Sequence, residues 1–521
     1  MKKDNFYKAN QKLLDRKIKY IPLRYILSAL VSVAIVCAVI SICVLLCYHF
    51  SWFYFAVMLG QLVCVLNLIA LDSNPDYKLP WLLLILVLPV IGFLLYMIFA
   101  SRKLKKKYIK RLKLLAKRSY EKDDKELFDE LKEQSKNAYC QATLLTKSAY
   151  AHLFTNTKLK YYPSGEETFK DMLIDLKKAT QFIYLEYFII DGGKFWNSIL
   201  EILYQKAQSG VEVKVLYDDI GCMKTLPSKY YKLLNKIGIN SATFSPFKGM
   251  ANSEFNNRNH RKMMIIDGYI AYTGGINVAD EYINEEERFG HWKDSGIRIE
   301  GEACWEFTSL FVTDFGISVK NVPKIENNIY PEYKINQKNG YIIPFGDGPK
   351  PLYEKEVGKA IIQSMLSNAT KYVYITTPYL IIDSDLCQSI EDAALRGVKV
   401  KIIVPRIPDK KIIFNLTKSY FPRLMKSGVE IYQYEPGFIH AKTYLVDDEI
   451  AMLGTINLDY RSLVHHFENG VWLYKCDVIK DIKKDVEDVL TISSQVREQD
   501  VKLTPFKAFI KAILRIFAPL M

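Results

Sequence analysis

One stretch of this chain occurs twice, and it constrains the fold more than any other feature. HRKMMIIDGYIAYTGGIN begins at His260, and HAKTYLVDDEIAMLGTIN begins at His440. In both copies the His is followed by Lys at +2, Asp at +7, Gly at +14 and Asn at +17. The chain has only seven histidines, so five matches at equal offsets are improbable by chance. The repeat predicts a molecule with two similar halves.

Each copy is expected to form a β-hairpin that carries polar groups. MMII and TYLV are apolar and β-prone, and Asp267 and Asp447 begin the turn into a second strand. A His and a Lys two apart on a strand point to the same face, where an unpaired buried Lys would be costly. This favours a phosphate site, which Asn277 and Asn457 could also reach. Two hairpins with incidental polar residues are the alternative, and the in-register duplication disfavours it.

The flanking sequence repeats as well. ATQFIYLEYFIID (179–191) matches ATKYVYITTPYLIID (369–383), and KAQSGVEVKVLYDD (206–219) matches AALRGVKVKIIVPR (393–406). Each of these stretches is predicted to be a helix end followed by a buried strand. Strands that alternate with helices predict an α/β fold with mostly parallel sheets covered on both faces.

The positive charge lies beside the apolar N-terminal region. Residues 1–24 carry eight Lys or Arg and two Asp, and residues 101–118 carry ten Lys or Arg and no acid. Residues 119–521 sum to −1, although the whole chain carries +14. A nucleic-acid binder is expected to carry basic surface on its working domain. The distribution therefore predicts contact with anionic membrane lipids and no nucleic-acid partner.

The N-terminal region is predicted to be a membrane anchor. Three apolar stretches, 25–47, 52–71 and 80–100, are candidate spans, and the first is too long for a signal peptide. Basic flanks on both sides favour an even number of spans, which conflicts with three candidates. There are three possible explanations: one stretch lies at the interface, two stretches together form a shallow hairpin, or the N-terminal arm sits outside. We expect an integral, multi-pass protein whose catalytic part is cytoplasmic. Nine cysteines without paired spacing agree with a reducing compartment.

These patterns divide the chain into five parts. The parts are an anchor region with basic flanks (1–118), a charged helical and solvated connector (119–150), a first half (151–330), a second half (331–500) and a basic amphipathic C-terminal helix (501–521), which either docks on the protein or lies on the membrane.

The duplicated motif resembles that of the phospholipase D superfamily, which is defined by HxKxxxxD followed by a Gly and an Asn. Within it, GGINVADEYIN, HWKDSGIRIEG and NLDYRS are similar to bacterial cardiolipin synthases, which are proteins of the bacterial cell membrane. The resemblance implies two α/β/α halves related by a pseudo-twofold axis, with one active site between them. It also implies that two phosphatidylglycerol molecules are joined with release of glycerol.

The resemblance also implies the roles of individual residues. His260 attacks phosphorus to form a phosphohistidine, and His440 protonates the leaving alcohol and then deprotonates the incoming one. The sequence itself does not decide which His attacks. No carboxylate cluster suited to a two-metal site accompanies the motifs, so neither metal nor cofactor is expected. The candidate catalytic residues are His260, Lys262, Asp267, His440, Lys442 and Asp447, with Asn277 and Asn457 on the phosphate; the two Asp are expected to fix the turns.

A carboxylate is expected to orient each His. These roles fall on Asp294, at +34 from His260 in the first half, and on Glu468, at +28 from His440 in the second. The chain departs from the superfamily pattern at Gly275 and Thr455, where Ser is common, and at His466, where Asn is frequent.

Two other functions remain open from the sequence. A phospholipase D or nuclease would use water as the acceptor, although the near-neutral catalytic part disfavours a nuclease. A membrane-bound binding protein with an inactive site is disfavoured by the intact His-Lys sets. The pattern predicts no oligomeric state.

Overall fold

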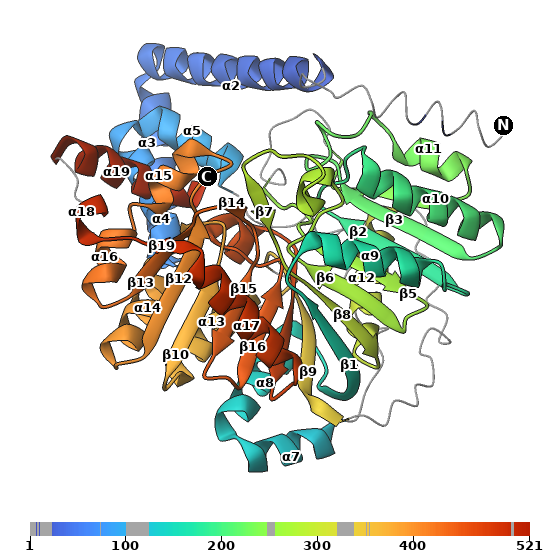
Figure 1. Cartoon of the computed structure of the whole chain (residues 1–521). Coiled ribbons are helices and arrows are strands. Elements are labelled where there is room, and N and C mark those ends of the chain that lie inside the picture. Colours follow the sequence, from blue (N-terminus) through green and yellow to red (C-terminus); the bar gives the residue numbers. More distant parts are fainter. Residues whose placement is uncertain are drawn as a thin grey trace.

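The computed structural model shows a large α/β body with apolar helices at its N-terminal side (Figure 1). The predicted basic run 101–118, most of the basic arm 1–24 and most of the predicted boundary 320–340 lie outside the described residues. The structure describes residues 7, 10, 23–72, 74–100, 124–246, 256–319, 338–350, 352, 353, 355–501 and 505–520.

Within these residues, fifteen strands form one sheet, and the two halves join where β1 pairs antiparallel with β9. From one edge to the other the order is β19-β13-β12-β10-β15-β16-β18-β9-β1-β8-β6-β5-β2-β3-β4. The order on one side of the β1–β9 pair mirrors the order on the other, apart from the edge strand β19. The sequence repeat is therefore a structural repeat.

The first half comprises a set of strands and the helices α9, α10, α11 and α12 around them. Its elements are β1 (Phe154–Tyr162), α9 (Gly165–Leu176), β2 (Phe182–Tyr187), α10 (Lys194–Gln208), β3 (Glu212–Asp218), α11 (Tyr231–Lys236), β4 (Asn240–Phe244), β5 (Lys262–Ile266), β6 (Ile270–Gly274), η2 (Asp280–Ile283), β7 (His291–Lys293), β8 (Gly296–Gly301) and α12 (Cys304–Ser318).

The second half repeats this plan. Its elements are β9 (Lys338–Asp347), α13 (Val357–Asn368), β10 (Tyr372–Thr376), β11 (Leu380–Ile381), α14 (Ser384–Leu395), β12 (Lys399–Pro405), α15 (Lys411–Thr417), α16 (Phe421–Lys426), β13 (Glu430–Tyr434), β14 (Gly437–Ile439), β15 (Thr443–Val446), β16 (Ile450–Gly454), β17 (Leu458–Asp459), η4 (Arg461–His465), β18 (Glu468–Tyr474), α17 (Val478–Thr491), β19 (Ser493–Gln495) and α18 (Glu498–Val501).

The prediction of mostly parallel strands is wrong, and the sheet is mixed. Parallel pairing in the large sheet is confined to β2-β3-β4 and β10-β12-β13. The other neighbouring pairs are antiparallel. They include each motif hairpin, β5–β6 or β15–β16, and its pairing with the strand on either side. The α/β class and the two similar halves stand as predicted.

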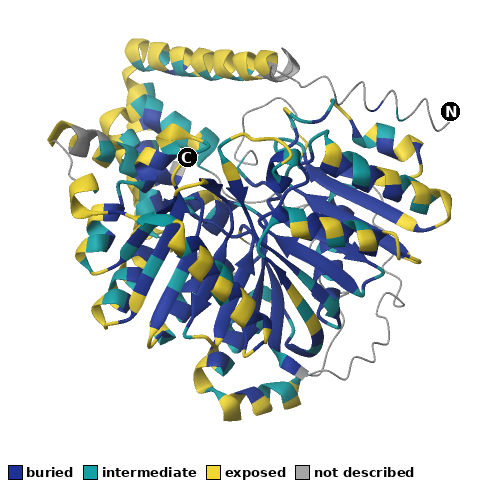
Figure 2. Cartoon of the chain, in the orientation of Figure 1, coloured by how far each residue is buried: buried dark blue, intermediate teal, exposed yellow. Residues whose placement is uncertain are grey.

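Both faces of the sheet are covered by helices. In β2, Ile183 and Leu185 belong to one hydrophobic core, whereas Phe182 and Tyr184 belong to another. Successive strand residues point to opposite faces, so these are cores on the two sides of the sheet. The strands at the centre are accordingly buried, and the covering helices are exposed on their outer sides (Figure 2).

The predicted solvated connector is packed into the body, which corrects that expectation. It forms α7 (Lys125–Gln134) and α8 (Lys136–Ala149). In α8, Ala138, Ala142 and Leu145 repeat at helical spacing and are fully buried in the core of the second half. Gln141 also accepts a hydrogen bond from Nε1 of Trp472 at 2.9 Å.

Two N-terminal helices are long and apolar enough to cross a membrane by length and composition. They are α2 (Leu23–His49), whose apolar part is Ala29–His49, and α3 (Ser51–Ala70). Phe50 alone, with an extended backbone, separates the two helices. They coincide with the first two predicted spans.

The third predicted span, 80–100, is not one helix. The chain forms α4 (Pro75–Val87) and α5 (Pro89–Phe99), which contact each other closely. The rings of Trp81 and Tyr96 are only 5.5 Å apart, whereas fifteen residues of straight helix rise about 22 Å. The segment therefore folds back as a hairpin, because Pro89 lacks the N–H needed to continue α4. The sequence left open a shallow hairpin made of two of the apolar stretches, whereas the structure folds this single stretch back on itself.

The start of α4 is fixed to the second half. Asn74 Nδ2 donates to carboxylate oxygens of Asp383 and Asp385, each at 2.9 Å. Asp76 accepts hydrogen bonds from the backbone N–H (2.6 Å) and the hydroxyl (3.1 Å) of Ser384. The loop between α3 and α4 is thereby held against the α/β body.

The C-terminal segment forms α19 (Pro505–Phe517) and η5 (Ala518–Leu520). α19 contacts α4 and α15, and the Arg515 guanidinium lies over the ring of Tyr420 at 4.6 Å. Phe506 and Phe509 remain exposed. This helix is therefore docked on the protein and still presents apolar side chains outward.

Candidate active site

The segment before each motif strand crosses to the other half. Asn259 forms a parallel bridge with Phe467, and the His260 N–H donates to the Phe467 carbonyl at 2.9 Å. In the other half, β14 pairs parallel with β7, and the His440 N–H donates to the Lys293 carbonyl at 2.7 Å. Phe467 precedes Glu468, and Lys293 precedes Asp294. Each histidine is therefore held next to a carboxylate of the opposite half.

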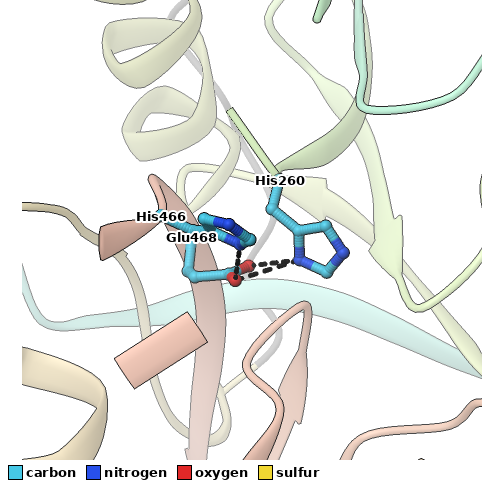
Figure 3. Close-up of side chains that lie close together, drawn as sticks. All are labelled: His260, His466 and Glu468. Carbon is cyan, nitrogen blue, oxygen red and sulfur yellow. Dashed lines mark hydrogen bonds and ion pairs between the residues drawn. The ribbon is translucent and has the colours of Figure 1, made fainter. Parts of the chain in front are cut away.

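The carboxylates are consequently exchanged between the halves. Nδ1 of His260 lies 2.9 Å from both carboxylate oxygens of Glu468 (Figure 3), and Nδ1 of His440 lies 2.8 Å from Oδ2 of Asp294. The expectation that each carboxylate serves the His of its own half is wrong. The reason is the cross-half backbone pairing, which the offsets along the sequence do not reveal. Both Glu468 and Asp294 are fully buried.

Burial keeps both imidazoles neutral. Desolvation lowers the pKa of His260 to about 3 and that of His440 to about 4, against the opposing effect of the adjacent carboxylates. The imidazoles in turn hold the pKa of Glu468 and of Asp294 below the usual carboxyl range, despite their burial. A neutral imidazole that donates from Nδ1 to a carboxylate has its Nε2 lone pair free for chemistry.

The two lysines lie in the same buried junction. Nζ of Lys262 donates to the carbonyl of His260 at 2.7 Å, and Nζ of Lys442 donates to the carbonyl of His440. Desolvation lowers the pKa of Lys262 to about 7 and that of Lys442 to about 8. The charge of Lys442 also lowers the pKa of Lys262, and that of Lys262 lowers the pKa of His440. The two His-Lys sets therefore lie near one another at the junction of the halves. The ammonium groups of Lys262 and Lys442 could bind an anion there.

The two asparagines differ in their hydrogen bonds. Asn277 accepts from the backbone N–H of Ile189 at 3.0 Å and donates to the Tyr282 hydroxyl at 2.6 Å. The buried Oδ1 of Asn457 has no hydrogen-bond partner among the described residues. Asn277 is thus tied into its own half, and phosphate contact by either amide stays a prediction.

Asp267 and Asp447 are separated from the reacting groups by the length of the motif strand. Each sits in a turn at positive φ (51° and 54°). Asp267 accepts hydrogen bonds from the backbone N–H groups of residues 180, 181 and 182 and from the Thr180 hydroxyl. Asp447 makes the same four contacts with residues 370, 371 and 372. Both bind the turn to the start of the neighbouring strand in the sheet, β2 or β10, as the turn pattern indicated. They therefore belong to the scaffold, and the expectation that they are catalytic is corrected.

Sequence reasoning missed the hydroxyls that hold Glu468. Thr455 Oγ1 donates to Oε2 at 2.5 Å, and Ser462 Oγ donates to Oε1 at 2.7 Å. The sequence did contain a signal for these hydroxyls. Ser462 is the Ser of NLDYRS, and Thr455 stands where Ser is common in the superfamily. At the position equivalent to Thr455, Gly275 lies so close to Asp294 that a Cβ would meet Oδ1 at 2.0 Å.

The surroundings of the two imidazoles are also unequal. Tyr282, Trp292 and Phe438 place their rings 5.4 to 5.9 Å from the ring of His440. His260 instead contacts Phe188 at 5.1 Å and His466 at 5.5 Å. His440 lies in an apolar aromatic wall, and His260 has a second imidazole beside it.

One group of described side chains has ligand atoms close enough to share a metal ion. The atoms of His260, His466 and Glu468 all lie within 4.8 Å of one another. Both oxygens of Glu468 already accept hydrogen bonds from His260, Thr455 and Ser462. This donor set therefore fits a hydrogen-bonded network around an orienting carboxylate better than a metal centre.

Comparison with known proteins places the same repeat in a family context. The family model described as "Cardiolipin synthase, PLD-like domain" matches twice, at residues 172–297 and 362–490. A second model, "Phospholipase_D-nuclease N-terminal", matches residues 61–100, which include the α4–α5 hairpin.

Several curated relatives align over most of the chain. An uncharacterized protein of Streptococcus mutans is 42% identical over 88% of this chain and 99% of its own length. Cardiolipin synthases of Alkalihalophilus pseudofirmus and Staphylococcus aureus are each 33% identical, over 86% and 85% of this chain and 90% of their own length. Among solved structures, a phosphatidylserine synthase of Haemophilus influenzae matches with a TM-score of 0.56 at 17% identity, covering 74% of this chain and 99% of that one. This last likeness concerns the fold alone.

Proposed function

The chain belongs to the phospholipase D-like cardiolipin synthase family, and on that premise we propose that it is a phosphatidyltransferase that joins two phosphatidylglycerol molecules. The products are cardiolipin and glycerol. The observation that carries the proposal is the meeting of two His-Lys sets, one from each half, in a buried junction where each imidazole is held by a carboxylate of the other half.

In the first step, Nε2 of His260 attacks the phosphorus of one phosphatidylglycerol. Glu468 holds Nδ1, which fixes the tautomer that presents the Nε2 lone pair. A P–N bond forms as the P–O bond to glycerol breaks, and protonated His440 gives its proton to the departing glycerol oxygen.

In the second step, His440 accepts the proton of a glycerol hydroxyl of a second phosphatidylglycerol. The oxygen of that hydroxyl attacks the phosphohistidine, the P–N bond breaks, and cardiolipin leaves while His260 returns to its neutral form. Asp294, hydrogen-bonded to Nδ1, stabilises the imidazolium form that His440 has before the first step and regains when it accepts the proton in the second.

The substrate's own charge prepares the site for this chemistry. In the empty site, burial and the two lysines oppose protonation of His440. A bound phosphodiester brings a negative charge between the halves, which favours the ammonium forms of Lys262 and Lys442 and the imidazolium form of His440. Lys262, Lys442, Asn277 and Asn457 are the proposed contacts to the phosphate oxygens.

We propose that the protein is an integral protein of the bacterial cell membrane with its active site at the cytoplasmic headgroup plane. Extracting a lipid would cost about 0.8 kcal/mol per CH₂ exposed to water. Anchoring the enzyme beside its substrate avoids that cost. The family membership and the apolar helices α2 and α3 support this location.

The proposed topology has two crossing helices and one hairpin that does not cross. Asn74 and Asp76 tie the end of α3 to the α/β body, so that end lies on the side of the active site. If α3 and α2 both cross, the N-terminus lies on that side too. The α4–α5 hairpin starts and ends there, so the basic segments 1–24 and 101–118 both face the cytoplasm, as the positive-inside rule favours.

The activity is tested by incubating the reconstituted protein with phosphatidylglycerol vesicles in EDTA and analysing the lipids by mass spectrometry. Cardiolipin with equimolar glycerol is the expected result. Phosphatidic acid as the main product would instead indicate a hydrolase, and unchanged lipid a binding protein. His260→Ala and His440→Ala are each expected to abolish turnover, with Asp448→Ala as a surface control.

The topology is tested by cysteine labelling in a variant without the nine native cysteines. An impermeant maleimide applied to intact cells is expected to label Phe50→Cys and to leave Asp72→Cys unlabelled. Labelling of Asp72→Cys from outside would contradict the proposed orientation.

A further inference from the structure

His466 and Trp292 are equivalent residues of the two halves. Each stands two positions before the carboxylate that holds the opposite histidine, Glu468 or Asp294. The ring of His466 lies 5.5 Å from that of His260 at an interplanar angle of 44°, and the ring of Trp292 lies 5.6 Å from that of His440 at 48°. The two catalytic imidazoles are therefore covered in the same way, once by an imidazole and once by an indole.

The two covering residues differ in what they can do to the carboxylate. Nδ1 of His466 lies 3.7 Å from Oε1 of Glu468 (Figure 3). Neither ring nitrogen of His466 has a closer hydrogen-bond partner in the part of the chain that the structure describes, and both are buried. The indole of Trp292 carries no charge, and its only polar atom, Nε1, is buried without a partner among the described residues.

Glu468 is consequently shared among more donors than Asp294. The Glu468 carboxylate accepts hydrogen bonds from His260, Thr455 and Ser462, and His466 is a further neighbour. The Asp294 carboxylate accepts hydrogen bonds from His440 and from the backbone N–H of Ser295. A carboxylate stabilises an imidazolium through its negative charge. Additional donors that interact with the same carboxylate weaken this stabilisation. His260 is therefore less easily protonated than His440.

We propose that His466 is the positioning residue that makes the two halves unequal. By interacting with Glu468, His466 weakens the stabilisation of a positive charge on His260. His260 therefore stays the neutral imidazole that attacks phosphorus, and His440 is the group that carries the proton. This inference rests on the proposed function, because it assigns the roles within that reaction. Both halves otherwise offer the same His-Lys set, so a difference near the carboxylates must choose the nucleophile.

The electrostatics of the site agree with this assignment. Burial is the main cause that lowers the pKa of both His260 and His440, and the charge of His466 is a further, smaller cause that lowers the pKa of His260. No equivalent contribution from Trp292 acts on His440.

The test exchanges the two covering residues and locates the covalent intermediate. The full-length protein in phosphatidylglycerol vesicles is quenched with alkali, where P–N bonds survive, and the modified histidine is identified by peptide mass spectrometry. Wild type is expected to carry the phosphatidyl group on His260. The double variant Trp292→His/His466→Trp, which exchanges the two covering rings, is expected to carry most of it on His440.

A matched single variant separates electrostatics from packing. His466→Phe keeps a ring against His260 but removes the nitrogen beside Glu468, so the label is expected on both histidines. A label that stays on His260 in His466→Phe and in the exchanged variant, each with wild-type melting temperature, would overturn the proposal. If the exchanged variant does not fold, the single variant decides in the same way. No covalent label on either histidine of the wild type would instead refute the proposed reaction itself.

Discussion

At the scale of residues, the state of each histidine depends on a carboxylate that comes from the other half. His260 and His440 are both buried beside a lysine, and that environment opposes positive charge. Glu468 and Asp294 supply the compensating charge and fix the tautomer. The orienting carboxylates are thus as important to the proposed chemistry as the histidines themselves.

Asp294→Asn is expected to lower kcat by about two to four orders of magnitude, as in other sites where an amide replaces the carboxylate behind a catalytic histidine. The amide no longer stabilises the His440 imidazolium and permits the wrong tautomer. Steady-state cardiolipin formation measures the effect, with melting temperature as the control. A variant with half of the wild-type kcat would show that Asp294 has no orienting role.

The lysines predict loss of activity at alkaline pH. The pKa of Lys262 is lowered to about 7 and that of Lys442 to about 8, so both carry charge below these values and lose it as the pH rises through them. Phosphate binding needs the charged forms, and kcat/KM is therefore expected to fall between pH 7 and 9. Because bound substrate favours the charged lysines, kcat should fall less. In Lys262→Gln the decline should begin about one pH unit higher, and an unchanged profile would contradict the assignment.

At the scale of elements, the motif aspartates hold each hairpin to its neighbouring strand in the sheet, β2 or β10. Asp267 accepts four hydrogen bonds from residues 180–182, and Asp447 makes the same contacts in the second half. The aspartate that identifies the motif in the sequence therefore fixes the strand on which the lysine lies.

Asp267→Gly is expected to destabilise the protein by about 2–6 kcal/mol, since four hydrogen bonds are lost and each is worth about 0.5–1.5 kcal/mol. Glycine adopts the positive φ of this turn, so the change isolates the hydrogen bonds from backbone strain. Asp447→Gly should cost a similar amount. Thermal unfolding measures both, and a loss of activity without loss of stability would argue for a direct catalytic role instead.

The α4–α5 hairpin depends on a glycine at its closest approach. A Cβ on Gly92 would lie 2.3 Å from the Leu84 carbonyl oxygen, which is backbone and cannot move aside cheaply. Gly92→Val is therefore expected to open the hairpin and lower the yield of folded protein in membranes. Gly60→Ala is the control, because its Cβ would meet Phe93 at an ordinary 3.4 Å. Equal yields of the two variants would speak against the hairpin.

At the scale of the whole molecule, one continuous sheet makes the two halves a single unit. The β1–β9 pair joins them at the centre, and the parallel bridges before His260 and His440 join them again at the site. Neither half alone contains both a histidine and the carboxylate that holds it.

Double-mutant cycles on the free energy of unfolding, measured by thermal unfolding, distinguish this crossed arrangement from two self-contained halves. His260→Asn with Glu468→Gln, residues from opposite halves, is expected to show a coupling of about 0.5–3 kcal/mol, as contacting pairs do. His260→Asn with Asp294→Asn, both from the first half, should be close to additive. The reverse result would mean that each carboxylate serves its own half.

The sequence by itself determined the repeat, the motif hairpins, the two His-Lys sets and the first two apolar helices. These follow from local patterns: β-prone runs, turn residues at fixed offsets, and apolar stretches of spanning length. It also contained both orienting carboxylates, but not their partners.

The tertiary structure alone decided which carboxylate holds which histidine, that the sheet is mixed and continuous, and that residues 80–100 fold back at Pro89. It also decided that His466 and Trp292 cover equivalent imidazoles. Each of these depends on pairing between segments far apart in the chain. Local residue preferences do not encode such pairing, because it is selected by the packing of the whole sheet.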